Sequence, residues 1–299
     1  MRRLPQIALL PDGKRLHLQD GPIDLIVEAK GGGREVRVAY EAATRRFTGL
    51  LDELCAELGE LRKAADPARC ALQGVVARRM HAAVTPFAAD SFITPMAAVA
   101  GSVAEEILGA MLDTTDLDRA YVNNGGDIAL HLTRSKQFTV GLIDRPDSQG
   151  LMRTMVIRAG DPIRGIATSG RHGRSFSLGI ADAVTVLAKT ASKADAAATI
   201  IANAVDLPGH PAIVRLPASE LQPDSDLGAR LVTRDVGALS ESEIEGALET
   251  GADCARRLLA AGLIEGAALR LKGETVTVGV RRAGSQAFHE RALEHAVQA

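Results

Sequence analysis

Residues 120–132 of this chain read AYVNNGGDIALHL, two apolar segments on either side of a short polar one. The apolar segments read as strands, and Asn124, Gly125, Gly126 and Asp127 between them fit a hairpin turn, because glycine accepts the positive φ angles of tight turns. The same residues also fit an anion-binding turn, since glycine amides can face an anion and the two polar side chains can bond a ligand. The local sequence favours the hairpin and leaves the anion site open.

Hairpins recur on both sides of this stretch. One is predicted over residues 5–19 around Pro11-Asp12-Gly13, and another near the C-terminus over 268–278 around Lys272-Gly273. A further hairpin is predicted around the triple glycine 31–33, with Val36, Val38 and Tyr40 in its second strand. Short strands are also expected at residues 138–143, 152–157, 165–167 and 183–188.

Helices come in blocks between these hairpins. Apolar periodicity and Pro signals predict helices over residues 41–64, 68–84, 96–113, 192–204 and 241–261. The segment 206–237, rich in Pro, Asp and Leu, reads as an excursion. Because there is no regular βαβ alternation, the order of elements favours an α+β fold over a doubly wound sheet. We expect a single domain over 1–299, with two intertwined subdomains (about 1–115 and 116–285) as the alternative.

The composition indicates a globular protein with a sizeable core, with 46% hydrophobic and 24% charged residues. The formal net charge is -2, so the chain does not have the excess of basic residues that is typical of nucleic-acid-binding proteins. We find no signal-like segment and no run of 18 apolar residues, and so expect no membrane segment and a cytoplasmic location. The cysteines Cys55, Cys70 and Cys254 fit neither a zinc site nor a disulfide framework, and Cys55 and Cys254 are expected to be buried free thiols.

Two further motifs carry polar groups that suit a ligand. Thr168, Ser169 and Gly170 follow a predicted strand, and hydroxyls beside a glycine suit a loop that touches phosphate or ribose. An ordinary loop is the alternative. His172 is the loop histidine nearest to these motifs, and Asp182 is an additional carboxylate.

Asp195 and Thr199 lie four residues apart in a predicted helix, and therefore on one face of it. A carboxylate and a hydroxyl so placed can bind one hard cation such as Mg²⁺, which keeps coordination places for water and substrate phosphates. The alternative for Asp195 is a first-turn aspartate that complements the helix dipole.

Taken in chain order, these motifs resemble the ApbE superfamily of FAD:protein FMN transferases. The order is a small-residue helix, Asn-x-Gly-Gly-Asp, Thr-Ser-Gly and Ala-Asp-Ala-x-x-Thr. The similarity is greater to one branch of that superfamily, and it is carried by the sequences PMAAVAG (95–101), NGGD (124–127), ADA (181–183) and PDSDLG (223–228). The resemblance covers about residues 20 to 280.

This resemblance implies a T-fold-like antiparallel sheet flanked by helices. It implies Mg²⁺ held by Asp195 and Thr199, with backbone carbonyls supplied near Ala97 to Gly101. The Gly-Gly-Asp turn and Thr-Ser-Gly would line FAD. From the residues themselves, and not from the resemblance, His172 or Asp182 is our candidate proton acceptor. In the transferases a Ser or Thr hydroxyl of an acceptor protein attacks the FAD pyrophosphate, FMN becomes phosphoester-linked and AMP leaves. A homodimer is expected by analogy with T-fold-like sheets.

The chain also departs from the transferase pattern. The stretch His-Ile-x-Asp-Pro-x-Thr-Gly that follows Thr-Ser-Gly in the transferases is missing, since residues 171–178 read RHGRSFSL. The Lys expected in the small-residue helix is absent. Three hypotheses therefore stay open: an Mg²⁺-dependent enzyme that moves FMN or cleaves the FAD pyrophosphate, a flavin- or cofactor-binding protein without turnover, and an enzyme that uses the pocket for another small molecule.

Overall fold

The fold is built on one large antiparallel sheet. The computed structural model describes residues 4–143 and 151–279. Within them, the main sheet comprises β1 (Gln6–Leu9), β2 (Leu16–Asp20), β3 (Ile23–Lys30), β4 (Arg119–Asn124), β5 (Asp127–Leu132), β8 (Gly165–Ser169), β9 (Ala183–Ala188), β12 (Gly266–Leu271) and β13 (Glu274–Gly279), hydrogen-bonded in that order. Every neighbouring pair runs antiparallel, so the expectation of an α+β fold with an antiparallel sheet is confirmed.

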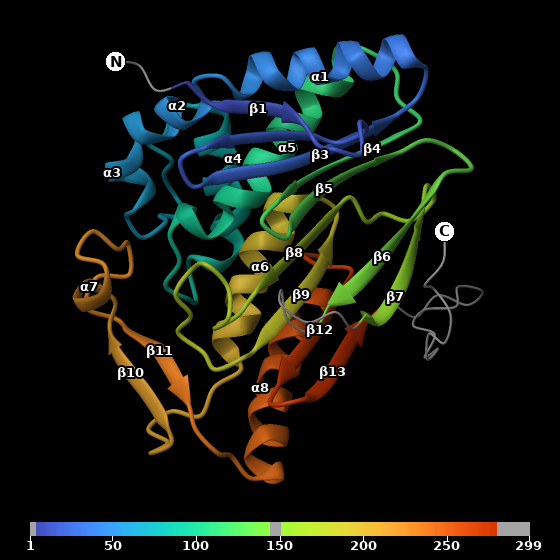
Figure 1. The fold of residues 1–299 in the computed structure, drawn as a ribbon. Coiled ribbons are helices and arrows are strands. Elements are labelled where there is room, and N and C mark those ends of the chain that lie inside the picture. Colours follow the sequence, from blue (N-terminus) through green and yellow to red (C-terminus); the bar gives the residue numbers. More distant parts are fainter. Residues whose placement is uncertain (1–3, 144–150, 280–299) are drawn as a thin grey trace.

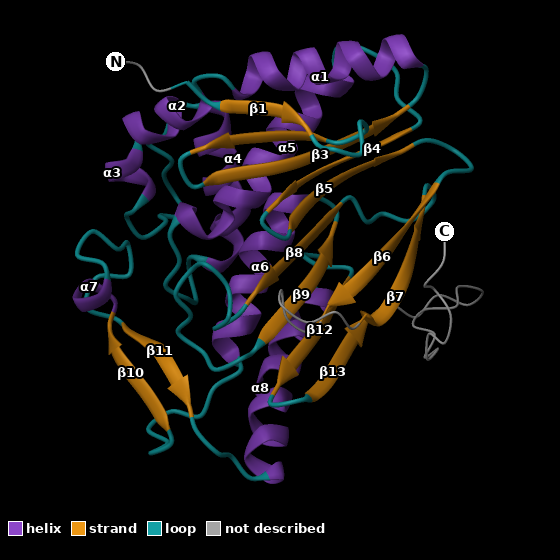
Figure 2. Cartoon of the chain, viewed as in Figure 1, coloured by secondary structure: helices purple, strands orange, loops and turns teal. Residues whose placement is uncertain are grey.

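Helices cover one face of this sheet (Figures 1 and 2). The long ones are α1 (Gly33–Phe47), α4 (Val75–Val84), α5 (Val99–Leu112), α6 (Ala191–Ala204) and α8 (Glu241–Ala260). Shorter pieces are α2 (Leu50–Ala56), α3 (Leu58–Leu61), η1 (Thr85–Phe87) and η2 (Pro95–Ala98). Alternate residues of the strands face the helices, as in β3, where Leu25 and Val27 join Phe47, Met80 and Ile107 in the main core.

A second ribbon covers part of the other face of the sheet. β6 (Gln137–Ile143) and β7 (Leu151–Arg158) pair with each other (Figure 1). Ile157 of this ribbon belongs to a separate apolar cluster with Leu130, Ile166 and Leu187, which point away from the helices. The sheet is therefore covered on both sides near β5, β8 and β9.

The segment 206–237 is an excursion, as predicted, with a two-stranded sheet of its own. β10 (Ile213–Pro217) pairs with β11 (Leu231–Val236), and α7 (Ala218–Leu221) lies between them in sequence. A capping box follows, in which the Ser240 hydroxyl accepts from the Glu243 amide and the Glu243 carboxylate accepts from the Ser240 amide. These bonds satisfy two amides at the start of α8.

Some sequence expectations are wrong. Residues 33–47 form a helix, so the triple glycine is not the turn of a hairpin. The helix expected over 41–64 is interrupted at Gly49, whose φ of 88° no α-helix accepts, and α4 begins at Val75 instead of 68. Cys254 is buried as expected, but Cys55 is exposed. The tail after residue 279 lies outside the described residues.

One segment of the described chain has the length and apolar composition of a membrane-spanning helix. It is Pro95–Leu112, which comprises η2 and α5, and half of it is buried inside the structure. α5 contacts α1, α4 and α6 on its sides and strands β4 and β5 below it. Its apolar residues therefore have protein partners, as expected of a core helix.

Candidate functional site

Three segments that are distant in sequence meet at one end of α5. The Asn124 side-chain amide, at the end of β4, donates to the Ala100 carbonyl at 3.2 Å. The Asp195 carboxylate, on α6, accepts from the Gly101 amide at 2.9 Å. The hairpin turn, the start of α5 and the first turns of α6 thus form one polar junction, and it contains most of the residues that the sequence indicated.

The Asn-Gly-Gly-Asp sequence is a hairpin turn, as the local sequence favoured. Asn124 pairs with Asp127 across the two strands, and Gly125 and Gly126 between them have φ angles of 63° and 113°. The Gly126 amide donates to the Asn123 side-chain oxygen at 2.8 Å, which fixes the turn. Because the turn lies beside α5, the hairpin interpretation and a role at the site are compatible.

Gly101 allows α5 and α6 to approach each other closely. A Cβ atom at this position would overlap the Ala191 carbonyl and lie 2.8 Å from the Ser192 nitrogen. The absence of a side chain at Gly101 therefore brings the α5 amides within reach of Asp195.

Asp127 and Asp195 are close enough to affect each other's ionisation. Burial raises the pKa of Asp127 to about 7, although the Thr168 amide, 3.2 Å away, and the charge of Arg174 favour its ionised form. Burial, and then the negative charge of Asp127, raise the pKa of Asp195 well above its ordinary value, against the amides of Gly101 and Ala100. A pair of poorly solvated carboxylates is typical of sites that bind a cation or a proton.

The available donors are hard oxygens, which suit Mg²⁺. The Gly101 amide donates to Oδ2 of Asp195, and the carboxylate keeps further lone pairs that can bind a cation. Half-buried Thr199 lies one turn further along α6 on the same side. Ala97 lies in η2, and the Ala100 carbonyl already accepts from Asn124. The described residues hold no cluster of three His, Cys, Asp or Glu side chains, so any cation here would keep several water or substrate ligands.

The Thr168, Ser169 and Gly170 motif contributes mainly through its backbone. The Thr168 amide donates to Asp127, but its hydroxyl lies 2.9 Å from that of Thr185, on the sheet face opposite Asp127. Ser169, the next residue of β8, faces the Asp127 side. Gly170 has a φ of 149°, and a Cβ there would come within 2.6 Å of the Asp182 carbonyl oxygen.

His172 and Asp182 contact each other, at 3.3 Å from Nε2 to Oδ1. Asp182 is also bound by the Arg171 guanidinium, at 2.6 Å, and by the Lys272 amide, at 2.6 Å. In the described part of the chain, neither His172 nor Asp182 has a hydrogen bond or ion pair with Asp127 or Asp195. Asp182 therefore anchors its loop, and the structure does not bring this pair together with the half-buried carboxylates of Asp127 and Asp195.

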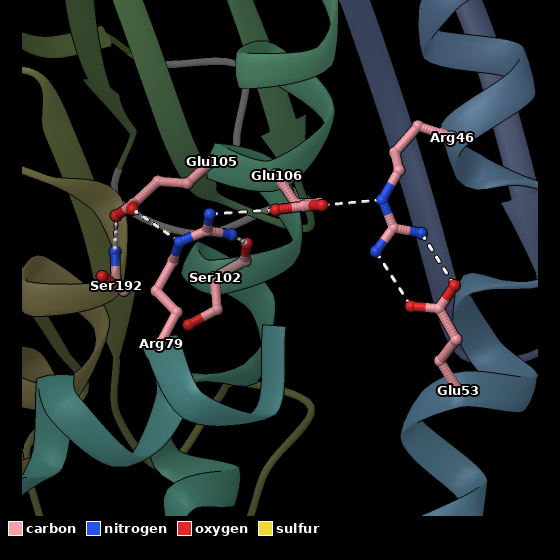
Figure 3. Close-up of polar contacts among 7 residues, drawn as sticks. All are labelled: Arg46, Glu53, Arg79, Ser102, Glu105, Glu106 and Ser192. Carbon is pink, nitrogen blue, oxygen red and sulfur yellow. Dashed lines mark hydrogen bonds and ion pairs between the residues drawn. The ribbon is translucent and has the colours of Figure 1, made fainter. Parts of the chain in front are cut away.

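A network of hydrogen bonds and ion pairs joins α4, α5 and the start of α6 next to the junction (Figure 3). Glu105 accepts from the buried Ser192 amide at 2.6 Å and contacts the Arg79 guanidinium at 3.4 Å. Arg79 also donates to the Ser102 carbonyl at 3.0 Å and binds Glu106 at 2.9 Å. These contacts hold α4, α5 and the start of α6 together, about one turn further along α5 than Gly101.

Sequence reasoning missed Arg174. Its guanidinium occupies the space over Gly125, where any Cβ would overlap Nη2, and its charge acts on Asp127. Nη1 donates to the Pro22 carbonyl at 3.3 Å. An exposed arginine in a loop carries no local signal, because its position over the turn depends on how the loop folds back.

Comparison with known proteins identifies the family. The model of the family described as AbpE bacteria matches residues 7–277. The chain belongs to this family. The ApbE-like assignment made from the motif order is thereby confirmed.

The family model covers residues 7–277, whereas the curated relatives align over a shorter part of the chain. A UPF0280 protein of Methanopyrus kandleri is 42% identical over 132 residues, which are 43% of this chain and 48% of that protein. A UPF0280 protein of Methanothermobacter thermautotrophicus is 40% identical over 117 residues, 39% of this chain and 44% of the relative. The chain spans about half the length of the curated relatives it matches. Among solved structures, the apo form of Pseudomonas stutzeri flavinyl transferase ApbE is similar, with 12% identity, a TM-score of 0.45, and coverage of 92% of this chain and 95% of that one.

Proposed function

We propose that this chain is an Mg²⁺-dependent protein that binds flavin nucleotides and moves FMN from FAD or cleaves the FAD pyrophosphate. The observation that carries the proposal is the meeting of Asp127 and Asp195 beside the Asn-Gly-Gly-Asp turn and the start of α5. Family membership over residues 7–277 supports a ligand of the ApbE class. A divalent cation between two carboxylates favours their ionised forms, and so offsets the cost of placing two negative charges close together away from water.

Each residue of the junction has a proposed role. Asp195, Asp127 and Thr199 would hold Mg²⁺, which supplies charge neutralisation for the pyrophosphate. Arg174 would attract and orient a phosphate, because guanidinium groups form strong charge-assisted hydrogen bonds with phosphate oxygens. Asn124, Gly125, Gly126 and Ser169 would line the nucleotide. In the transfer, the oxygen of an acceptor hydroxyl forms a bond to the FMN phosphorus, the bond from that phosphorus to the AMP oxygen breaks, AMP leaves, and the hydroxyl proton passes to solvent.

A binding protein without turnover is the second candidate. It is favoured by the position of His172, whose contact is Asp182 and not the carboxylate pair. It would keep flavin affinity and release no AMP. In either case the acceptor protein and the homodimer stay predictions.

The test is calorimetric titration of the protein with FAD, with and without Mg²⁺, followed by chromatography for AMP. Asp195→Asn removes the charge but keeps an oxygen that can accept from Gly101, so it separates metal binding from helix capping. We expect FAD affinity in Mg²⁺ to fall at least about tenfold in this variant. Asp253→Asn, which changes an exposed carboxylate on α8, is the control and should bind FAD like the wild type.

Each outcome decides between the candidates. Mg²⁺-dependent binding with AMP release supports the enzyme, and binding without AMP supports the binding protein. If Asp195→Asn binds FAD in Mg²⁺ as tightly as the wild type, the proposed metal site is wrong.

A further inference from the structure

A cavity separate from the carboxylate pair lies at the other end of α6. Its volume is about 540 Å³, and it is lined by residues of the loop at Ser91, the last turns of α6, α8 and the β10–β11 excursion. Asn203 in its wall is eight residues beyond Asp195, which corresponds to about 12 Å along the helix. Its volume is in the range of small-molecule sites, roughly 300–1,000 Å³.

Three arginines line this cavity against one acidic residue. Arg215 forms an ion pair with that residue, Asp206, so their charges cancel. The Arg230 guanidinium lies over the Phe92 ring, with its Cζ atom 3.2 Å from the ring centroid. Arg257 lies in the last turn of α8. Over residues 4–143 and 151–279, neither Arg230 nor Arg257 is ion-paired with a carboxylate, so the cavity carries two uncompensated positive charges.

The other walls provide an amide donor and an apolar surface. Asn203 accepts from the Leu178 amide through Oδ1, at 3.0 Å, which leaves its NH₂ group to donate to a ligand. Leu178, Ile200 and Leu231 line the apolar side. A ligand that matches these walls has an anionic group, an apolar body and little positive charge.

We propose that this cavity binds an organic phosphate in which a phosphate monoester is joined through a sugar or sugar-alcohol chain to a planar ring, the chemistry of a mononucleotide. The guanidinium fork matches phosphate oxygens in a bidentate way, which favours phosphate at Arg230 and Arg257. The contact of Arg230 with the Phe92 ring holds one guanidinium in place and presents a flat surface to a ring. Among the described residues that line the cavity, the one carboxylate is paired with Arg215, which leaves no free acidic group for a cation, so binding needs no Mg²⁺. The inference goes beyond the proposed function and does not rest on it.

The experiment is calorimetric titration of the whole chain with AMP and with FMN in the presence of EDTA. Adenosine and riboflavin are the matched probes without phosphate, and inorganic phosphate is the probe without a ring. We expect AMP or FMN to bind at one site per chain, and the probes lacking either half to bind at least about tenfold more weakly. The double variant Arg230→Gln, Arg257→Gln should weaken binding of the phosphorylated probe at least about tenfold.

Arg256→Gln is the matched control. Arg256 is the neighbour of Arg257 on α8, but it is directed to Asp253, at 2.8 Å, and to Glu249, and does not line the cavity. It should bind the probes like the wild type. The proposal is wrong if neither AMP nor FMN binds without Mg²⁺, if inorganic phosphate or the unphosphorylated probe binds equally well, or if the double variant binds like the control. All three arginines are at least partly exposed, so their loss should leave the fold intact.

Discussion

Asp127 and Asp195 tie the stability of this protein to pH. Burial raises the pKa of Asp127 to about 7, so between about pH 4 and 7 the folded chain keeps a proton that the unfolded chain has lost. The stabilising contribution of this proton is full below the unfolded pKa and is lost as the pH rises through the folded pKa. Asp127→Asn, which cannot ionise, should therefore melt only slightly above the wild-type temperature near pH 5 and well above it near pH 8.

Differential scanning fluorimetry in EDTA measures this effect. Asp253→Asn should follow the wild type at both pH values, because Asp253 is exposed on α8. Added Mg²⁺ should raise the wild-type melting temperature near pH 8 and leave that of Asp127→Asn less changed. Equal melting temperatures of wild type and Asp127→Asn near pH 8 in EDTA would show that Asp127 ionises without cost.

The sequence indicated members of the candidate site only where the local backbone carries a signal. The motifs led to Asn124, Asp127 and Asp195, because turn glycines and helical spacing are local properties. The direction of a side chain is less local. Thr168 points to Thr185 on the far face of the sheet, and Arg174 reaches the turn from a loop, both because of tertiary contacts.

The crossing of α5 and α6 limits the size of the residue at position 101. Gly101→Ala would place a Cβ against the Ala191 backbone, and overpacking of this kind costs about 1–3 kcal/mol. Gly109→Ala on the same helix is the control, because no atom lies within 4 Å of its added Cβ. This control should be stabilised by up to about 1 kcal/mol through helix propensity.

Urea unfolding followed by circular dichroism gives the free energies of unfolding for both variants. Because Gly101 presents its amide to Asp195, we also expect Gly101→Ala to weaken Mg²⁺-dependent FAD binding, and Gly109→Ala to leave it unchanged. If the two variants have the same stability, the close approach of the helices is not a constraint.

Most helices and strands could be predicted from the sequence. The start of helix α1 was predicted as a strand, and this error has a physical cause. Val36, Val38 and Tyr40 recur at every second position, which indicated a strand after the triple glycine. Val36, Ala39 and Tyr40 also form an apolar helical stripe with Ala43 and Phe47, and Ala39, Ala43 and Phe47 are buried in α1. Short apolar runs fit both periods, and here the tertiary core selected the helix.

At the scale of the whole molecule, the main sheet crosses the boundary between the two halves of the sequence. β3 pairs with β4, and the sheet continues from there to β13. The α+β class could be predicted from the order of hairpins and helices. The pairing of β5 with β8 and of β9 with β12 could not, because it joins strands separated by long intervening segments.

Continuity of the sheet and the contact of Glu105 with Ser192 lead us to expect one cooperative unfolding transition. Scanning calorimetry should give a calorimetric enthalpy equal to the van't Hoff enthalpy, whereas independent subdomains would give two peaks. Glu105→Ala leaves the buried Ser192 amide without its carboxylate, which should cost about 1–3 kcal/mol and lower the melting temperature of the whole transition. Glu249→Ala, which removes an exposed partner of Arg256, should change stability by no more than about 0.5 kcal/mol. A second peak in Glu105→Ala would mean that α5 and α6 belong to units joined mainly by this contact.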